Sequence, residues 1–188
     1  MMSEKQQLLI RTAIQLISEE GVGVATAKIA RTAGVSNGTL FNYFATKQIL
    51  FETVYLHINK EMAQEILVQA DKQTSLKHFL LAVWMSFAAW CARNPVEIEA
   101  LNTLKSSQLL GDSVTDEGEK VWAKIFVMLE QGISDGVIIN APARLITTSL
   151  EGLIHSVAAY ASQQNLPELH YEKLTRRSFD LFWKGITL

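Results

Sequence analysis

The segment that most constrains the fold runs from Thr26 to Leu50 and reads TAKIARTAGVSNGTLFNYFATKQIL. Ala30 is a small residue one helical turn before Gly34, so another helix backbone can approach it closely, and Gly34 permits the positive φ that a sharp turn requires. Ser36 is placed to cap the following helix through its hydroxyl group. Two short helices joined by a tight turn form a helix-turn-helix unit, whose second helix enters the major groove of DNA. The segment therefore predicts a DNA-binding regulator.

The second of these helices is expected to bury one face and to expose a small polar face. Leu40 and Phe44 belong to the buried face, and the exposed polar set comprises Asn37, Thr39, Asn42 and Tyr43. Asn37 and Asn42 each carry a hydrogen-bond donor and an acceptor, which suits them to the edge of an adenine base. Phe41 either packs against a thymine methyl group or sugar, or it supports the packing of the helices, and the sequence leaves both alternatives open.

The run IARTAGVSNGTLFNYFATKQIL resembles the DNA-binding signature of the tetracycline-repressor (TetR) family, bacterial repressors whose larger domain binds small molecules. The matching elements are Thr26, Ile29-Ala30, Ala33-Gly34-Val35-Ser36, Gly38-Thr39-Leu40, Tyr43-Phe44, Lys47 and Leu50. The resemblance covers about Leu8 to Phe51, and the rest of the chain matches only in length and helical layout. The family commonly has Tyr where this chain has Phe41, so one hydroxyl group directed at phosphate is missing here.

The resemblance also implies which side chains contact the DNA backbone. Thr26, Thr39, Tyr43 and Lys47 stand where the family contacts phosphates, and hydroxyl and ammonium groups suit phosphate oxygens chemically. Lys28, at the start of the first of the two helices, is a further candidate. The complete set of predicted DNA-binding residues is Thr26, Lys28, Ser36, Asn37, Gly38, Thr39, Phe41, Asn42, Tyr43 and Lys47.

Helical periodicity runs through almost the whole chain. It contains only three prolines and no alternating runs of Val, Ile and Thr bounded by turn signals, so strands are not expected. We predict an all-α fold of about nine helices, over residues 3–20, 26–33, 37–43, 46–70, 75–93, 95–111, 117–135, 142–164 and 170–185. Residues 1–46 are expected to form a three-helix DNA-binding domain, and residues 47–188 a helical ligand-binding and dimerisation domain.

Composition and charge agree with a DNA-facing end on an acidic body. The net charge is −2, with +2 over residues 1–60 and −4 over the remainder. The single cysteine, Cys91, excludes an intrachain disulfide and suits the reducing cytosol. The N-terminus lacks the apolar core of a signal peptide, and the uncharged apolar run 79–92 is 14 residues, short of the ~20 needed to span a bilayer. We expect a cytoplasmic protein without a membrane partner.

Aromatic side chains gather on two of the predicted helices of the larger domain, over 75–93 and 117–135. Aromatic residues at helical spacing usually form core, and that alternative stays open from the residues alone. The resemblance implies instead a cavity for a small molecule, since the family's equivalent helices surround one. The predicted ligand-binding residues are Trp84, Phe87, Trp90, Asn102, Trp122, Phe126 and His155. An apolar or aromatic effector is expected, because no run of Lys or Arg accompanies these rings.

The segment 142–164 is expected to be buried on two sides. Small residues form a smooth stripe along one side of it, and larger apolar residues cover another side, a pattern typical of a helix buried on both sides. Since only one more helix follows, a second copy of the chain is the natural cover, with packing inside a monomer as the alternative. The predicted dimer-interface residues are Ser149, Gly152, Ser156, Ala159, Phe179 and Phe182.

Enzymatic motifs are missing from the sequence. The four histidines are scattered, and no nucleophile elbow, phosphate-binding loop or dinucleotide-binding motif occurs. We therefore predict no catalytic residue, no metal and no cofactor. The expected function is that of a homodimeric repressor released from a palindromic operator by a small ligand. The alternative is a ligand-independent DNA-binding dimer with an architectural or partner-binding role.

Overall fold

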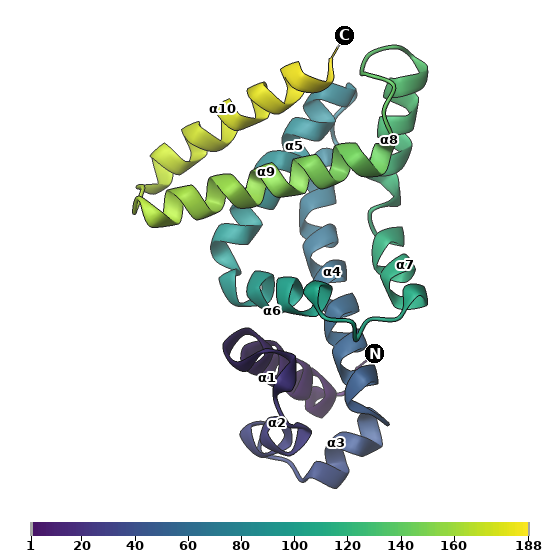
Figure 1. Ribbon diagram of the computed structural model, residues 1–188, viewed down its shortest axis with the longest axis vertical. Helices are drawn as coiled ribbons and strands as arrows, with labels where there is room; N and C mark the ends of the chain where they lie inside the picture. Colours follow the sequence, from purple (N-terminus) through teal and green to yellow (C-terminus); the bar gives the residue numbers. More distant parts are fainter. Residues whose placement is uncertain (1, 188) are drawn as a thin grey trace. The chain divides into compact units, whose positions relative to one another are not determined.

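The computed structural model describes residues 2–187, which form ten α-helices and one short 3₁₀ helix (Figure 1). The helices are α1 (Glu4–Glu20), η1 (Gly21–Gly23), α2 (Thr26–Thr32), α3 (Asn37–Tyr43), α4 (Lys47–Ala70), α5 (Leu76–Arg93), α6 (Pro95–Ser106), α7 (Asp112–Lys120), α8 (Ala123–Ser134), α9 (Ala143–Gln163) and α10 (Glu168–Ile186). Extended pairing within the described residues is limited to one antiparallel bridge between Ile138 and Thr187. The predicted all-α fold is confirmed.

The helix count differs from the prediction between residues 112 and 135. The polar stretch 112–116, predicted to be a loop, begins helix α7 instead. Asp112 lies in the first turn of α7, where its charge complements the helix dipole, and the Thr115 hydroxyl donates to the Asp112 carbonyl at 2.8 Å. The predicted single helix over 117–135 is interrupted at Trp122, whose φ of −100° and ψ of 5° are not helical, and α8 begins after it.

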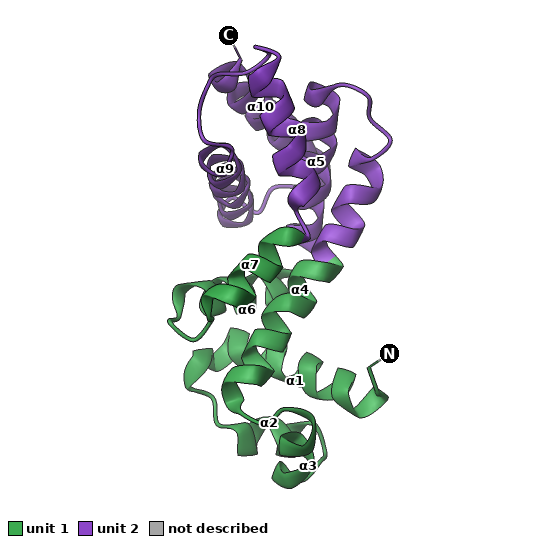
Figure 2. Ribbon diagram, turned by 90° about the vertical axis from the view of Figure 1, so that its right-hand side faces the viewer, with its two compact units in different colours: residues 1–61, 94–120 green, residues 62–93, 121–188 purple. Residues whose placement is uncertain are grey.

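The helices group into two compact units (Figure 2). Unit 1 comprises residues 1–61 and 94–120, and unit 2 comprises residues 62–93 and 121–188. Helix α4 contributes its first part to unit 1 and its last part to unit 2. These units are groups of packed helices and not functional domains, so the predicted division after residue 46 stays a prediction.

Unit 1 contains the helix-turn-helix segment together with α1, α6 and α7. The apolar side of α1, which includes Leu9 and Ile17, is completely buried, and α6 packs against α1. Helix α7 approaches α4 closely at Gly118, where a Cβ atom would lie 2.5 Å from the ring of Tyr55. Only glycine fits at this position without displacing the buried tyrosine ring.

Unit 2 is built around the packing of α5 and α9 with α10. Trp84 on α5 is fully buried, and its ring centroid lies 5.7 Å from that of Phe179 and 5.2 Å from that of Phe182, both on α10. The indole Nε1 of Trp84 donates a hydrogen bond to the Thr175 carbonyl at 3.0 Å. Among the described residues, no helix is long and apolar enough to cross a membrane.

Candidate nucleic-acid interface

The turn between α2 and α3 has the geometry that the sequence predicts. Gly34 adopts a φ of +69°, which a residue with a Cβ atom rarely adopts. The Val35 amide donates to the Ala30 carbonyl at 2.9 Å, and the Gly34 amide donates to the Arg31 carbonyl at 3.1 Å. These bonds close the end of α2, and Ala30 is buried there. The turn holds α3 against α2 with no side chain in the way.

Helix α3 is capped as predicted. The Ser36 hydroxyl accepts a hydrogen bond from the Thr39 amide at 3.0 Å and lies 2.9 Å from the Thr39 hydroxyl. In the same way, the Thr46 hydroxyl caps α4 by accepting from the Ile49 amide at 3.1 Å. Helix α2 has no side-chain cap, because Thr26 is its first helical residue and Ala25 occupies the cap position.

The two faces of α3 separate as expected from the sequence. Leu40 and Phe44 are buried, with 0% and 1% of their surface exposed. The surface of α3 that remains open to solvent is formed by Asn37, Gly38, Phe41, Asn42 and Tyr43, with Thr39 half-buried. An exposed helix bearing two amides and a phenol is therefore available to enter a groove of DNA.

Phe41 lies on the open side of α3. Its side chain is 41% exposed, a large fraction for a phenyl ring. Of the two roles left open by the sequence, support of the packing is the less compatible with this exposure. The ring is instead available to contact the apolar parts of a nucleotide.

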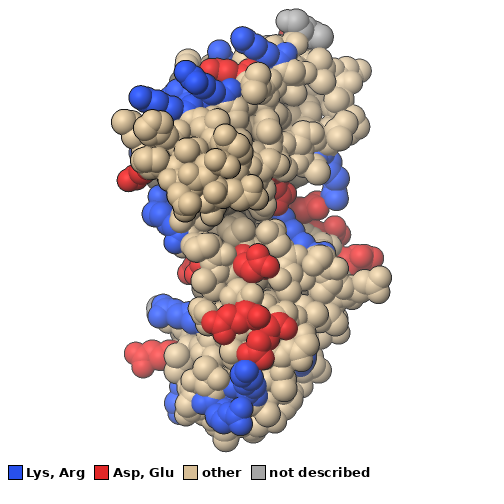
Figure 3. All heavy atoms as spheres, turned by 60° about the vertical axis from the view of Figure 1, so that its left-hand side comes forward, with Lys and Arg blue, Asp and Glu red and all other residues tan. Residues whose placement is uncertain are grey.

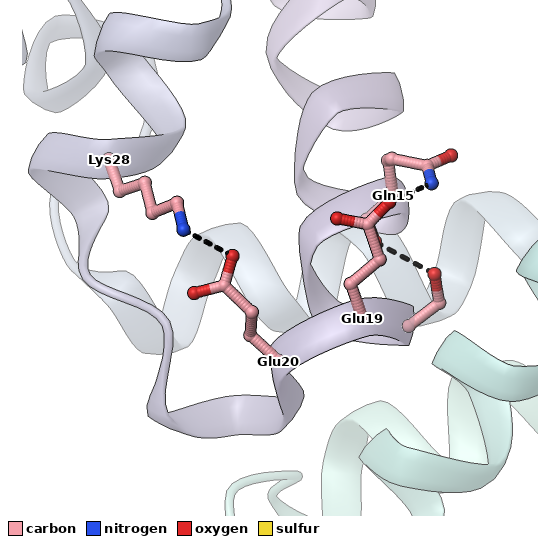
Figure 4. A network of polar contacts seen from close by, with 5 residues as sticks. Gln15, Glu19, Glu20 and Lys28 are labelled. Carbon is pink, nitrogen blue, oxygen red and sulfur yellow. Dashed lines mark hydrogen bonds and ion pairs between the residues drawn. The ribbon is translucent and has the colours of Figure 1, made fainter.

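Two lysines beside α3 have specific partners. The Lys28 ammonium lies 2.5 Å from the carboxylate of Glu20, the last residue of α1, and Figure 4 shows the two side chains pointing toward one another. The Lys47 Nζ atom, in the first turn of α4, lies 5.2 Å from the centroid of the Phe51 ring. Sequence reasoning missed both partners. The Lys47–Phe51 pair has the detectable spacing of one helical turn, whereas Glu20 and Lys28 meet only because η1 reverses the chain.

Positive charge is not continuous over the face of the molecule shown in Figure 3. In the view of Figure 3, Lys and Arg side chains lie in small groups with Asp and Glu side chains close to them. On a face of this kind, attraction to DNA relies on a few well-placed cations, each of which contributes to the salt dependence of binding.

Comparison with known proteins agrees with this geometry. Residues 9–54 match the sequence profile described as bacterial regulatory proteins, tetR family. A putative tetR family transcription regulator from Shewanella sp. PV-4 has the same fold, with a TM-score of 0.87 and 27% identity over 99% of this chain and 100% of that one. The DNA-binding segment is that of a TetR-family transcriptional regulator, and the whole chain has the fold of such a regulator.

Two further relatives show how widely this fold is used. The nucleoid occlusion factor SlmA of Haemophilus ducreyi is 30% identical over 94 residues, which are 49% of this chain and 46% of that relative, so the chain spans about half the length of this relative. The transcriptional regulator FadR from Bacillus subtilis, solved in complex with stearoyl-CoA, has a TM-score of 0.75 and 17% identity, over 96% of this chain and 98% of that one. At 17% identity, the similarity to FadR shows only that the two proteins share a fold.

The residues predicted to bind ligand are only partly brought together in the structure. Phe87 on α5 meets His155 on α9, with ring centroids 5.7 Å apart at an interplanar angle of 71°. Trp84 packs against Phe179 and Phe182 on α10 and is fully buried. The other predicted residues are Trp90, which is buried, and Trp122, Phe126 and Asn102, which are half-buried, with Asn102 in unit 1 and the rest in unit 2.

The residues predicted to form a dimer interface divide into two sets. The stripe on α9, formed by Ser149, Gly152, Ser156 and Ala159, is exposed. Leu145 and Tyr160 on the same helix are also exposed, at 58% and 53%. Phe179 and Phe182 on α10 are buried against Trp84 within the same chain, so they are not surface residues that a partner could contact directly.

Unit 2 also contains a buried thiol. Burial, reinforced by the negative charge of Glu151, raises the pKa of Cys91 from its usual 9.0 to about 12. Near it, the Tyr171 hydroxyl donates to the Ala88 carbonyl at 3.0 Å, and burial raises the pKa of Tyr171 as well. Cys91 is thus a protonated core residue at neutral pH, in agreement with its apolar sequence context.

Proposed function

We propose that this protein is a homodimeric repressor that binds a palindromic DNA operator in the cytoplasm and is released by a small apolar or aromatic ligand. The observation that carries the DNA-binding part is the exposed polar side of α3, held in place by a capped turn. The proposal rests on chemistry as well as on the family, because the exposed amides are those that pair with base edges.

The DNA contacts divide into two groups under this proposal. Asn37 and Asn42 contact base edges, and Phe41 packs on a thymine methyl group or a sugar. Phosphates are contacted by Lys47, Tyr43 and the hydroxyl groups of Thr26 and Thr39. These contacts fix the position of α3 on the DNA without selecting a base sequence. Lys47 is suited to this role because the Phe51 ring beneath its ammonium restricts the side chain before DNA arrives.

The dimer is supported by the exposed side of α9. The position where a Cβ atom would stand on Gly152 has no neighbouring atom within 4 Å, so the stripe of small residues is open. Exposed Leu145 and Tyr160 add apolar surface to the same helix. A second copy would cover this surface and bring two α3 helices to the ~34 Å separation of successive major grooves on one side of DNA. Sedimentation of a stable monomer at micromolar concentration would refute this part.

The ligand part is supported by the aromatic residues of unit 2, some of which are only half-buried. Phe87 and His155 are in ring contact, and Trp122 and Phe126 are half-buried on the same unit. The FadR relative, which has the same fold, was solved with a ligand carrying a long acyl chain. To shift the population strongly, the ligand must favour the state with low DNA affinity by several kcal/mol.

Tryptophan fluorescence tests the ligand part directly. A panel of fatty acids, acyl thioesters and aromatic compounds is titrated into the protein, and DNA affinity is measured with each compound. The proposal expects at least one compound to change the fluorescence and to release DNA, because the coupling between the two sites is reciprocal. A panel that changes neither quantity would favour the second candidate.

The second candidate is a ligand-independent DNA-binding dimer that acts through a partner or through DNA architecture. The burial of Trp84 in the core favours it, since one predicted ligand contact is lost to plain packing. The SlmA relative, named for nucleoid occlusion, is a second point in its favour. The two candidates share the DNA-binding segment and differ only in what the rest of the chain does.

A further inference from the structure

We propose that Glu20 acts as an electrostatic brake on DNA binding by holding the Lys28 ammonium away from phosphate. The inference rests on the proposed DNA-binding function and adds a residue with a negative effect on it. The complex forms only after Lys28 exchanges the Glu20 carboxylate for a phosphate oxygen, so Glu20 lowers the affinity for every DNA sequence.

The geometry places the two groups in direct contact. The ammonium and carboxylate lie 2.5 Å apart, and both side chains are well exposed, at 42% and 36%. Lys28 lies two residues after Thr26, on the helix that packs against α3. A carboxylate in this contact neutralises a cation that would otherwise attract phosphate.

A purely structural role for this pair is not needed to explain the local fold. The turn between α1 and α2 is closed by backbone bonds, from the Val24 amide to the Gly21 carbonyl at 3.3 Å and from the Lys28 amide to the Ala25 carbonyl at 2.9 Å. Val24 and Ile29 are buried on either side of the first turn of α2. An exposed ion pair adds little to such a structure, so its main effect is on the charge available to DNA.

The chain offers a matched control in the residue before Glu20. Glu19 is also an exposed carboxylate at the end of α1, but it is hydrogen-bonded to Gln15 and lies away from Lys28 in Figure 4. Glu19→Gln and Glu20→Gln change the net charge of the protein by the same amount. Any difference between the two variants therefore reports the contact with Lys28 and not the overall charge.

The experiment measures the binding of a labelled mixed-sequence 30-base-pair duplex by fluorescence anisotropy across a salt series. We expect Glu20→Gln to bind about two- to fivefold more tightly than Glu19→Gln at low salt, the range of an exposed ion pair, with the difference shrinking as salt rises. In a Lys28→Gln background the two substitutions should have equal effects. Lys28→Gln alone should flatten the log–log salt slope by about 0.9.

Several outcomes overturn the brake. Equal affinities of the Glu19 and Glu20 variants, or a weaker Glu20→Gln at an unchanged unfolding midpoint, would show that the ion pair does not compete with DNA. Should Glu20→Gln fail to fold, an unchanged salt slope in Lys28→Gln decides against the inference by itself. If the unmodified protein binds no duplex at all, the proposed function fails, and this result is distinguishable from failure of the brake.

Discussion

Replacing Ser36 with alanine should loosen the recognition helix without disturbing the rest of the protein. The substitution removes the acceptor of the Thr39 amide, now 3.0 Å away, and the contact of 2.9 Å between the two hydroxyl groups. Loss of such a cap costs about 1 kcal/mol, in a range of roughly 0.5–2. Helix α3 has only seven residues, which is too short to persist alone, so the cost falls mainly on α3.

This magnitude fixes what should be observed. About 1 kcal/mol raises the population of locally opened α3 roughly fivefold, which hydrogen exchange of its amides should detect. It should also lower the thermal midpoint by about 2–4 °C if the protein unfolds cooperatively. Ser36→Asn is the matched control, because asparagine caps helices about as well as serine. The reasoning is refuted if Ser36→Ala exchanges at the original rate, or if Ser36→Asn is as destabilised as Ser36→Ala.

Three further predictions concern unit 2. Gly152→Arg should convert the dimer to a monomer in sedimentation, because it places bulk and charge on the exposed stripe of α9, whereas an unchanged dimer would move the interface elsewhere. Cys91 should resist iodoacetamide at pH 8 and react after unfolding in urea, and rapid labelling of the native protein would contradict its burial. The stabilisation that comes from burying the neutral thiol is complete below pH 9 and is lost as the pH rises toward 12. Trp122→Ala should weaken the response to effector, with DNA affinity in the absence of ligand nearly unchanged; loss of folding would make this residue core.

The helix-turn-helix segment could be predicted almost completely because its determinants are local. The positive φ at Gly34, the caps at Ser36 and Thr46, and the burial of Leu40 and Phe44 follow from residue type and helical spacing. The start of α2 is less determined by residue type, because Thr26 is compatible with the cap position and with the first helical position. The choice between them depends on the backbone, which is extended at Ala25.

The packing outside the helix-turn-helix segment was harder to predict, since spacing shows which side of a helix is apolar but not what covers it. Phe179 and Phe182 were predicted to face a second chain, and Trp84 a ligand, whereas these three rings pack against one another. Residues 112–116, the start of helix α7, are polar, and their sequence predicts a loop because it gives no sign that this helix packs against another. That contact, between Gly118 and the ring of Tyr55, involves residues far apart in the sequence.

The most direct test of the account compares Asn37→Ala with Lys47→Ala on DNA selected by the unmodified protein from random duplexes and on unselected DNA. We expect the selected sites to be palindromic. Asn37→Ala should cost ~1–3 kcal/mol on selected DNA and relax the preference at one base position in each half-site, with little effect on unselected DNA. Lys47→Ala should weaken both by a similar factor and flatten the salt slope by about one. Equal losses from both variants on both kinds of DNA would contradict the assignment of α3 as the sequence-reading helix.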